Sequence, residues 1–187
     1  MKEKLVVYTM AIGGDYDLQP VTATYDVDYI CFTDQQNLEA CGWTILQVSP
    51  LLPGDTFRSS RDFKVRPHCW LANYTRSIYI DSSVHLHQDP LKIWDYLVPN
   101  ELIVFGGFFH SYRSNLLEEF FAVGSSKLDY KRVIEEQLQV YRTHNIRTLV
   151  EKPVWGGFLA RRHNNLSCIN AMEIWFAHIL RYSRRDQ

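Results

Sequence analysis

Short apolar runs rich in β-branched and aromatic residues recur along the chain, separated by stretches with helical or loop character. Runs of this length predict buried strands, and their alternation with helical segments is typical of layered α/β domains. We therefore expect a sheet flanked by helices. The predicted strands are residues 5–9, 29–33, 43–48, 77–80, 102–105 and 154–160.

Two long stretches in the second half of the chain have the spacing of helices. Residues 129–144 place apolar side chains at helical intervals with polar ones between them, which predicts an exposed amphipathic helix. Residues 166–180 carry apolar residues at i, i+3, i+4 spacing, and core packing explains that pattern. Asp89 before Pro90 predicts a helix start, with the aspartate as N-cap and the proline at the first helical position.

Length, charge and the longest apolar run indicate a single domain and favour neither a nucleic-acid partner nor a membrane span. A chain of 187 residues fits a single domain, and 46% hydrophobic residues can fill its core. A formal net charge of −1 without charged blocks does not favour a nucleic-acid partner. The longest apolar run, 102–109, is interrupted by glycines and is shorter than the roughly 20 residues of a spanning helix. No signal peptide is recognisable, so we expect a cytoplasmic protein without a transmembrane segment; the oligomeric state stays open.

An acid stands directly after one predicted strand. Asp81 follows the apolar residues 77–80 and precedes Ser82 and Ser83. Ligands in open α/β sheets bind beyond the carboxyl ends of strands, where a carboxylate can hold a divalent cation on a diphosphate. The alternative is that Asp81 caps the following turn.

Other segments add weaker signals. The first predicted strand leads into a Gly13-Gly14 turn, and the second ends at Asp34, which can accept a hydrogen bond from a base or ribose. Arg61 and Lys64 share a face if their stretch is helical, and such a face suits phosphate oxygens. Plain turns and a solvated helix face are the alternatives.

Together these segments resemble a known family. In order they read VVYTMAIGGDYD, DVDYICFTD, RSSRDFKVRPH, SIYIDSSV, GGFFHSYR, EKPVWGGFLARRHN and YSRRDQ. This series resembles the glycosyltransferase-like family shared by bacterial polysaccharide loci and plant mucilage-related proteins. The resemblance implies a GT-A-like fold, a Rossmann-type mixed sheet flanked by helices, as a single domain over 1–187. Because the chain stops close to the last segment, the resemblance implies either a truncated C-terminus or loss of the strand that normally follows.

The resemblance implies a nucleotide-sugar site. Its nucleoside pocket would be lined by Tyr8, Thr9 and Asp34, and Arg61, Lys64 and His68 would lie near the phosphates. Asp81, with Ser82 and Ser83 beside it, would face the diphosphate. A divalent metal, Mn²⁺ or Mg²⁺, would be held by Asp81 and Ser83, with His163 as a remote third ligand. Ser83 stands where such enzymes usually carry a second acid, and a hydroxyl is a poorer ligand for these ions, so metal dependence stays open.

The remaining site residues would bind the sugars and perform the chemistry. His110 and Arg113 resemble an acceptor-side or donor-sugar loop, with a polar surface loop as the alternative. Trp155, Gly156 and Gly157 would admit a sugar ring or mark a bulge. Gln187 belongs to the terminal active-site segment. An inverting enzyme also needs a carboxylate to deprotonate the acceptor, for which Asp186 comes first and Glu118 second.

The predicted function is transfer of a sugar from a nucleotide-sugar, a UDP-hexose, to a glycan or other hydroxyl acceptor in surface polysaccharide synthesis. The sequence does not decide between an inverting and a retaining outcome. The alternative is a non-catalytic nucleotide-sugar or glycan-binding protein with a degenerate transferase fold, motivated by Ser83 and the short C-terminus. A hydrolase has little support, because no nucleophile-elbow pattern is present.

Overall fold

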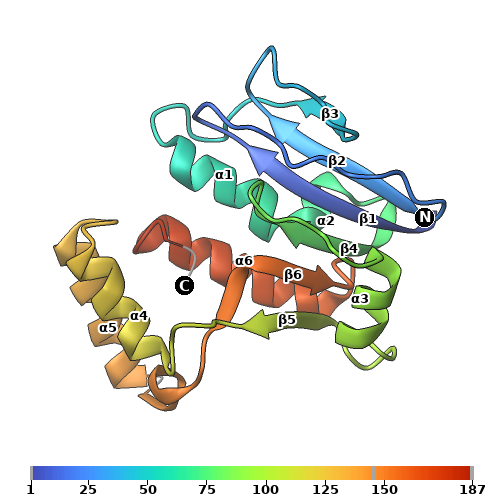
Figure 1. Cartoon of the computed structure of the whole chain (residues 1–187). Helices are drawn as coiled ribbons and strands as arrows, with labels where there is room; N and C mark the ends of the chain where they lie inside the picture. Colours follow the sequence, from blue (N-terminus) through green and yellow to red (C-terminus); the bar gives the residue numbers. More distant parts are fainter. Residues whose placement is uncertain (1, 145, 186–187) are drawn as a thin grey trace.

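The computed structural model describes residues 2–144 and 146–185, which form one α/β domain around a six-stranded sheet in the order β3-β2-β1-β4-β6-β5 (Figure 1). The strands are β1 (Lys2–Ala11), β2 (Val27–Thr33), β3 (Thr44–Gln47), β4 (Tyr74–Ile80), β5 (Phe105–Phe109) and β6 (Val154–Arg161). β1 to β4 pair in parallel, whereas β6 is antiparallel to both β4 and β5. The predicted fold class, a GT-A-like mixed sheet with flanking helices, is confirmed.

The helices follow the predicted patterns. They are α1 (Thr56–Val65), α2 (Pro67–Trp70), α3 (Pro90–Leu97), α4 (Leu116–Ser125), α5 (Lys131–His144), the 3₁₀ turn η1 (Ile146–Val150) and α6 (Leu166–Arg181). α3 begins as expected, because the Asp89 side chain accepts a hydrogen bond from the Leu91 N–H and Pro90 is the first helical residue. No helix in the described ranges is long and apolar enough to cross a bilayer.

β1 lies in the middle of the core. Consecutive residues from Leu5 to Tyr8 have no exposed surface, so both faces of the strand are covered. On one face Leu5 and Val7 pack with residues that include Trp94 of α3. On the other face Val6 and Tyr8 pack with residues that include Phe63 of α1. Burying a large apolar side chain contributes about 1.5–3 kcal/mol, so this strand fixes the sheet between its two helical layers.

β5 differs from its prediction. The strand was expected at 102–105, but Leu102 is 89% exposed in a turn and the strand runs from Phe105 to Phe109. A Cβ at Gly106 would lie 2.6 Å from the Leu97 carbonyl oxygen at the end of α3. Gly106, which appeared to interrupt an apolar run, therefore allows this strand to approach α3, and Gly107 allows close packing on Val154 of β6.

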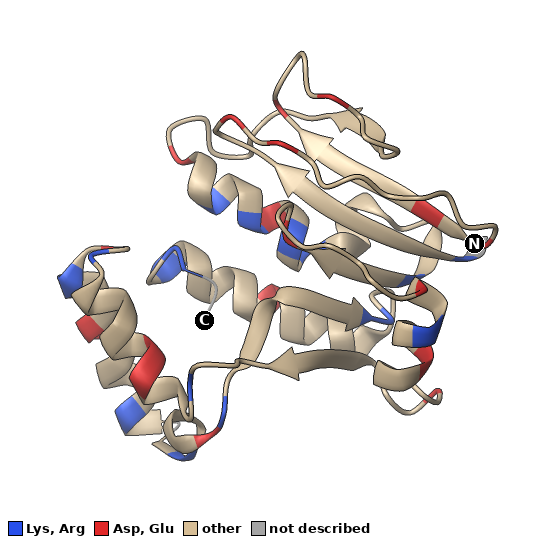
Figure 2. Ribbon diagram, viewed as in Figure 1, with Lys and Arg blue, Asp and Glu red and all other residues tan. Residues whose placement is uncertain are grey.

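α4, α5 and η1 form a lobe beside the sheet, with a small apolar core of their own (Figure 1). Polar contacts join this lobe to the end of α6. The Tyr141 hydroxyl lies 2.8 Å from His178 Nδ1, and Glu136 pairs with Arg181. Figure 2 shows charges of both signs dispersed over the chain, with basic segments on α1 and close to the C-terminus.

Candidate active site

Segments distant in sequence meet at one edge of the sheet. β1, β2, β4 and β5 end at this edge, and β6 begins there because it runs in the opposite direction. The Asp81 N–H donates to the Gly157 carbonyl at 3.0 Å, and Phe109 is paired with Val154. Ligands of open α/β sheets bind beyond the carboxyl ends of strands, so a site is expected at this edge.

Asp81 forms part of a small charged group at the end of β4. Its Oδ1 accepts a hydrogen bond from the Tyr79 hydroxyl at 2.6 Å and lies 3.7 Å from Lys64 Nζ. The Lys64 side chain is only 3% exposed, whereas that of Asp81 is 42% exposed. The Lys64 ammonium also lies 5.0 Å from the centre of the Tyr79 ring, a cation–π distance. A buried cation is thus held beside a carboxylate that is open to ligands.

The backbone of Lys64 is fixed from inside the core. Its carbonyl oxygen accepts hydrogen bonds from the Tyr8 hydroxyl and from Arg161 Nη2, both at 2.8 Å. Arg161 is fully buried and also donates to the Val65 carbonyl, so its positive charge lies at the carboxyl end of α1. Burial raises the pKa of the Tyr8 hydroxyl, although the charge of Arg161 opposes this shift.

These contacts correct two predictions. Tyr8 and Thr9 were expected to line a nucleoside pocket, yet neither has any exposed surface. Their strand is covered on both faces, so a nucleoside cannot reach either side chain in this structure. Tyr8 instead positions Lys64 through the carbonyl hydrogen bond. The Thr9 Oγ1 is buried without a hydrogen-bond partner among the described residues.

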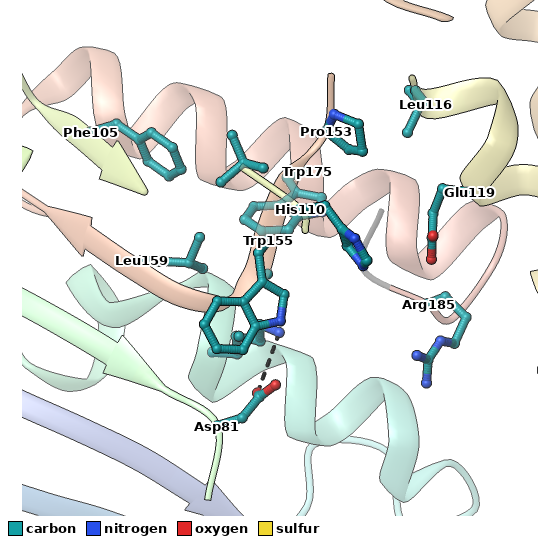
Figure 3. A pocket seen from close by; sticks show the side chains of 14 residues that line it. Asp81, Phe105, His110, Leu116, Glu119, Pro153, Trp155, Leu159, Trp175 and Arg185 are labelled. Carbon is teal, nitrogen blue, oxygen red and sulfur yellow. Dashed lines mark ion pairs between the residues drawn. The ribbon is translucent and has the colours of Figure 1, made fainter. Parts of the chain in front are cut away.

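A cavity of about 350 Å³ opens beside Asp81 (Figure 3). It brings together the end of β4, α1, the start of β6, the segment after β5, α4, α6 and the C-terminal segment. Among the predicted site residues, Lys64, Asp81, His110 and the stretch 155–157 line it. The full wall consists of Lys64, Asp81, Phe105, His110, Leu116, Glu119, Pro153, Val154, Trp155, Gly156, Gly157, Leu159, Trp175 and Arg185.

Glu119, not Glu118, faces this cavity. Glu118 accepts hydrogen bonds from the Ser114 N–H at 2.8 Å and from Asn115, while Asn115 Oδ1 accepts from the Glu118 N–H. This reciprocal arrangement resembles a capping box at the start of α4 and gives Glu118 a structural role. Glu118 does not line the cavity, so its position does not favour it as the base, and that role stays a prediction. The Asn-x-x-Glu spacing before an apolar helix is the signal that could have separated the two acids. Glu119 is held by Arg113, whose Nε donates to its Oε2 at 2.6 Å.

His110 completes this side of the cavity. Its N–H donates to the Pro153 carbonyl at 2.9 Å, which ties the end of β5 to the start of β6. His110 Nδ1 accepts from the Tyr112 N–H at 3.1 Å, so a proton on the neutral ring lies on Nε2. Arg113 does not line the cavity but positions Glu119 there.

The C-terminal segment contributes Arg185, which belongs to the terminal active-site segment that the resemblance implied but was given no role of its own. The Arg185 N–H donates to Ser183 Oγ, and Ser183 in turn donates to Asp129 Oδ2 at 2.9 Å. Arg185 Nε is buried without a hydrogen-bond partner among the described residues. An arginine at a cavity wall with an unused, buried Nε–H donor is suited to an anionic ligand. Asp186 and Gln187, two predicted site residues, lie outside the described residues.

Trp155 is held in place by a glycine. A Cβ at Gly157 would lie 2.4 Å from the indole Cε2 of Trp155, so the ring packs directly over the glycine backbone. In Figure 3 this ring extends toward Asp81. The close approach explains why residue 157 is a glycine, and it makes the indole a fixed wall of the cavity.

Four other residues that were predicted to bind the nucleotide-sugar do not line the cavity. Asp34 lies at the same sheet edge, where both of its carboxylate oxygens accept from the Gly13 N–H at 3.1 Å. Arg61 lies on α1 and stacks on Phe57, with its guanidinium 5.1 Å from the ring centre. Ser82 and Ser83 form the turn after β4, and Ser83 is exposed. Their binding roles stay predictions.

Two predicted histidines lie elsewhere. His68, on α2, has its Nε2 2.8 Å from Glu173 Oε1 on α6. His163 is fully buried, with Nδ1 2.9 Å from Ser77 Oγ and Nε2 3.0 Å from the Leu71 carbonyl. Ser77 lies within β4, four residues before Asp81, which corresponds to about 13 Å along an extended chain. His163 as a metal ligand with Asp81 is therefore corrected, because both of its ring nitrogens already have partners in the core. His68 does not line the cavity, and its place near the phosphates stays a prediction.

The described residues at Asp81 do not fit a resident divalent cation. Among the described residues that line the cavity the acids are Asp81 and Glu119, and Glu119 is paired with Arg113. One Asp81 oxygen contacts Lys64 Nζ and the Tyr79 hydroxyl, and Ser83 offers a neutral hydroxyl. Protein sites for such ions normally combine several oxygen ligands. The one described cluster with three potential ligands, which includes His68 and Glu173, lies outside the cavity and carries an arginine on Glu173.

The strand order, with an antiparallel β6 beside a charged cavity at the carboxyl edge, defines a GT-A-like α/β domain. The chain belongs to the TOD1/MUCI70 glycosyltransferase-like domain family, whose family model matches residues 21–187. The match begins after β1 and includes every residue of the cavity wall. A comparison with curated proteins found no match.

Proposed function

We propose that this chain is a glycosyltransferase that transfers a hexose from a UDP-sugar to a hydroxyl of a glycan acceptor. The observation that carries the proposal is the cavity at the carboxyl edge of the sheet, where Lys64 and Arg185 offer positive charge beside Asp81. Membership of a glycosyltransferase-like family supports the same class of reaction. Surface polysaccharide is the proposed destination of the sugar.

The donor diphosphate would bind to Lys64 and Arg185. During transfer the bond between the anomeric carbon and the phosphate oxygen breaks, and the nucleoside diphosphate leaves with the electron pair. Negative charge therefore grows on the diphosphate, and positioned cations stabilise it. Lys64 is held by its backbone and by Asp81, so it needs little rearrangement to do so. No step of this proposal uses a metal ion.

Glu119 would take the proton of the acceptor hydroxyl. The acceptor oxygen forms the new bond to the anomeric carbon, and its proton must pass to a base within hydrogen-bond reach. Glu119 is the described acid that faces the cavity opposite Asp81, and Arg113 fixes its orientation. This assignment corresponds to an inverting enzyme.

The two neighbouring acids of α4 test this assignment. We expect Glu119→Gln to lower turnover of UDP-hexose by 10²-fold or more, an order of magnitude typical of a lost general base, while UDP binding is retained. Glu118→Gln is the matched control, because it alters only the capping box and should keep turnover near that of the wild type. The measurement is release of UDP, with and without oligosaccharide acceptors.

The outcome separates transferase from binding protein. Equal turnover in the two variants would contradict the role of Glu119. UDP binding by the wild type with no turnover of any UDP-hexose would favour the non-catalytic alternative. Absence of UDP binding would contradict the proposal as a whole.

A further inference from the structure

A second hollow of about 730 Å³ adjoins the cavity. It lies between the segment after β4, α3 and the strands β5 and β6. Trp155 lines both spaces, so the two hollows share one wall residue. The first is charged, whereas no acidic side chain among the described residues lines the second.

Three exposed aromatic side chains line this hollow. Tyr96 is 77% exposed, Phe108 39% and Trp155 36%, a concentration of exposed rings that commonly marks a binding surface. Two of the rings have fixed positions. Phe108 packs edge-on against Phe158 at 5.1 Å between ring centres, and Trp155 rests on Gly157.

The rim of the hollow offers hydrogen-bonding groups. His85 and His87 stand near one another, with ring centres 6.2 Å apart, and Lys92 projects from α3. None of these three side chains has a hydrogen bond or ion pair to another described residue. Fixed aromatic faces surrounded by unused polar groups match a sugar ring, whose C–H face is apolar and whose edge carries hydroxyls.

We propose that this hollow binds a neutral pyranose residue of an oligosaccharide acceptor, with its C–H face against the aromatic side chains. The inference rests on the proposed transferase function, which requires an acceptor hydroxyl to reach the donor sugar beside the diphosphate. The shared Trp155 wall is consistent with this requirement, because the hollow and the charged cavity adjoin at that residue.

Binding of neutral tetrasaccharides without nucleotide tests the inference. Cellotetraose, xylotetraose and β-1,4-galactotetraose are titrated at millimolar concentration and followed by saturation-transfer NMR. We expect at least one to bind, and Tyr96→Ala to weaken that binding about tenfold through loss of a stacking face. His87→Ala, which removes only a rim group, should also weaken it. Tyr25→Ala is the matched control, since Tyr25 is 90% exposed and does not line the hollow.

A UDP titration on the same samples keeps the two proposals distinguishable. UDP binding without binding of any tetrasaccharide, or with tetrasaccharide affinity unchanged in both Tyr96→Ala and His87→Ala, would overturn the acceptor hollow alone. Tetrasaccharide binding that is lost in these variants, in a protein that does not bind UDP, would support a glycan site and overturn the transferase proposal.

Discussion

At the scale of single residues, the site depends on polar groups buried behind it. Arg161 and Tyr8 have no exposed surface, yet both bind the carbonyl oxygen of Lys64 and so fix the residue whose ammonium lies in the cavity. His163 is also fully buried, against Ser77 of β4 and the Leu71 carbonyl. Buried polar groups such as these are costly unless they are hydrogen-bonded, so each one restricts the conformations of its neighbours.

His163 gives stability a dependence on pH. Burial lowers the pKa of its ring from 6.5 to about 4, so between these values the unfolded chain binds a proton that the folded chain excludes. The free energy of unfolding should therefore be intact above pH 6.5 and fall as pH drops toward 4, by about 3 kcal/mol in total. Urea denaturation at a series of pH values measures this slope.

Two variants identify the source of that slope. His163→Gln should be less stable at neutral pH but should lose most of the pH dependence. His144→Gln, at an exposed position on α5, should keep the wild-type slope. A slope that persists in His163→Gln would assign the effect to other groups.

At the scale of elements, the segment after α6 connects the lobe to the cavity. The Asp129 side chain is 2% exposed, and it accepts hydrogen bonds from Ser183 Oγ at 2.9 Å and from the Arg184 N–H at 2.7 Å. From α1, Arg58 donates to the Tyr182 carbonyl at 2.8 Å. These contacts hold residues 183–185 so that Arg185 lines the cavity.

Loss of the Asp129 carboxylate should release this segment. We expect Asp129→Ala to lower stability by about 2 kcal/mol through its unpaired partners and to weaken UDP binding about tenfold as Arg185 leaves the cavity. Calorimetric titration with UDP and thermal unfolding measure the two effects. Lys131→Ala is the control, because that side chain is 84% exposed and should affect neither quantity. Wild-type UDP affinity in Asp129→Ala would contradict the role of this segment.

At the scale of the whole molecule, the sequence patterns predicted more of the fold than of the site. Apolar runs and the Asp89-Pro90 start located β1, β4 and α3, because burial and capping act on neighbours in sequence. The direction in which a side chain points was predicted less well. Tyr8 and His163 were interpreted as ligand contacts although they face the core, and the choice between Glu118 and Glu119 depended on a capping box.

Contacts between segments distant in sequence explain why the role of Arg185 was not predicted. Arg185 joins Lys64 and Asp81 in one cavity only because β6 is antiparallel and the terminal segment docks on Asp129. No spacing within a single segment carries that information. The site is therefore a property of the topology, whereas the individual strands and helices are properties of local sequence.

In the proposed mechanism, Lys64 and Arg185 bind the diphosphate of the donor without a metal ion. Calorimetric titration of UDP in the presence of EDTA tests it most directly. We expect the wild type to bind UDP, Arg185→Gln to bind it about 30-fold more weakly, a loss of about 2 kcal/mol, and Arg132→Gln on exposed α5 to bind as the wild type. UDP binding that requires Mn²⁺, or that is unchanged in Arg185→Gln, would contradict the claim.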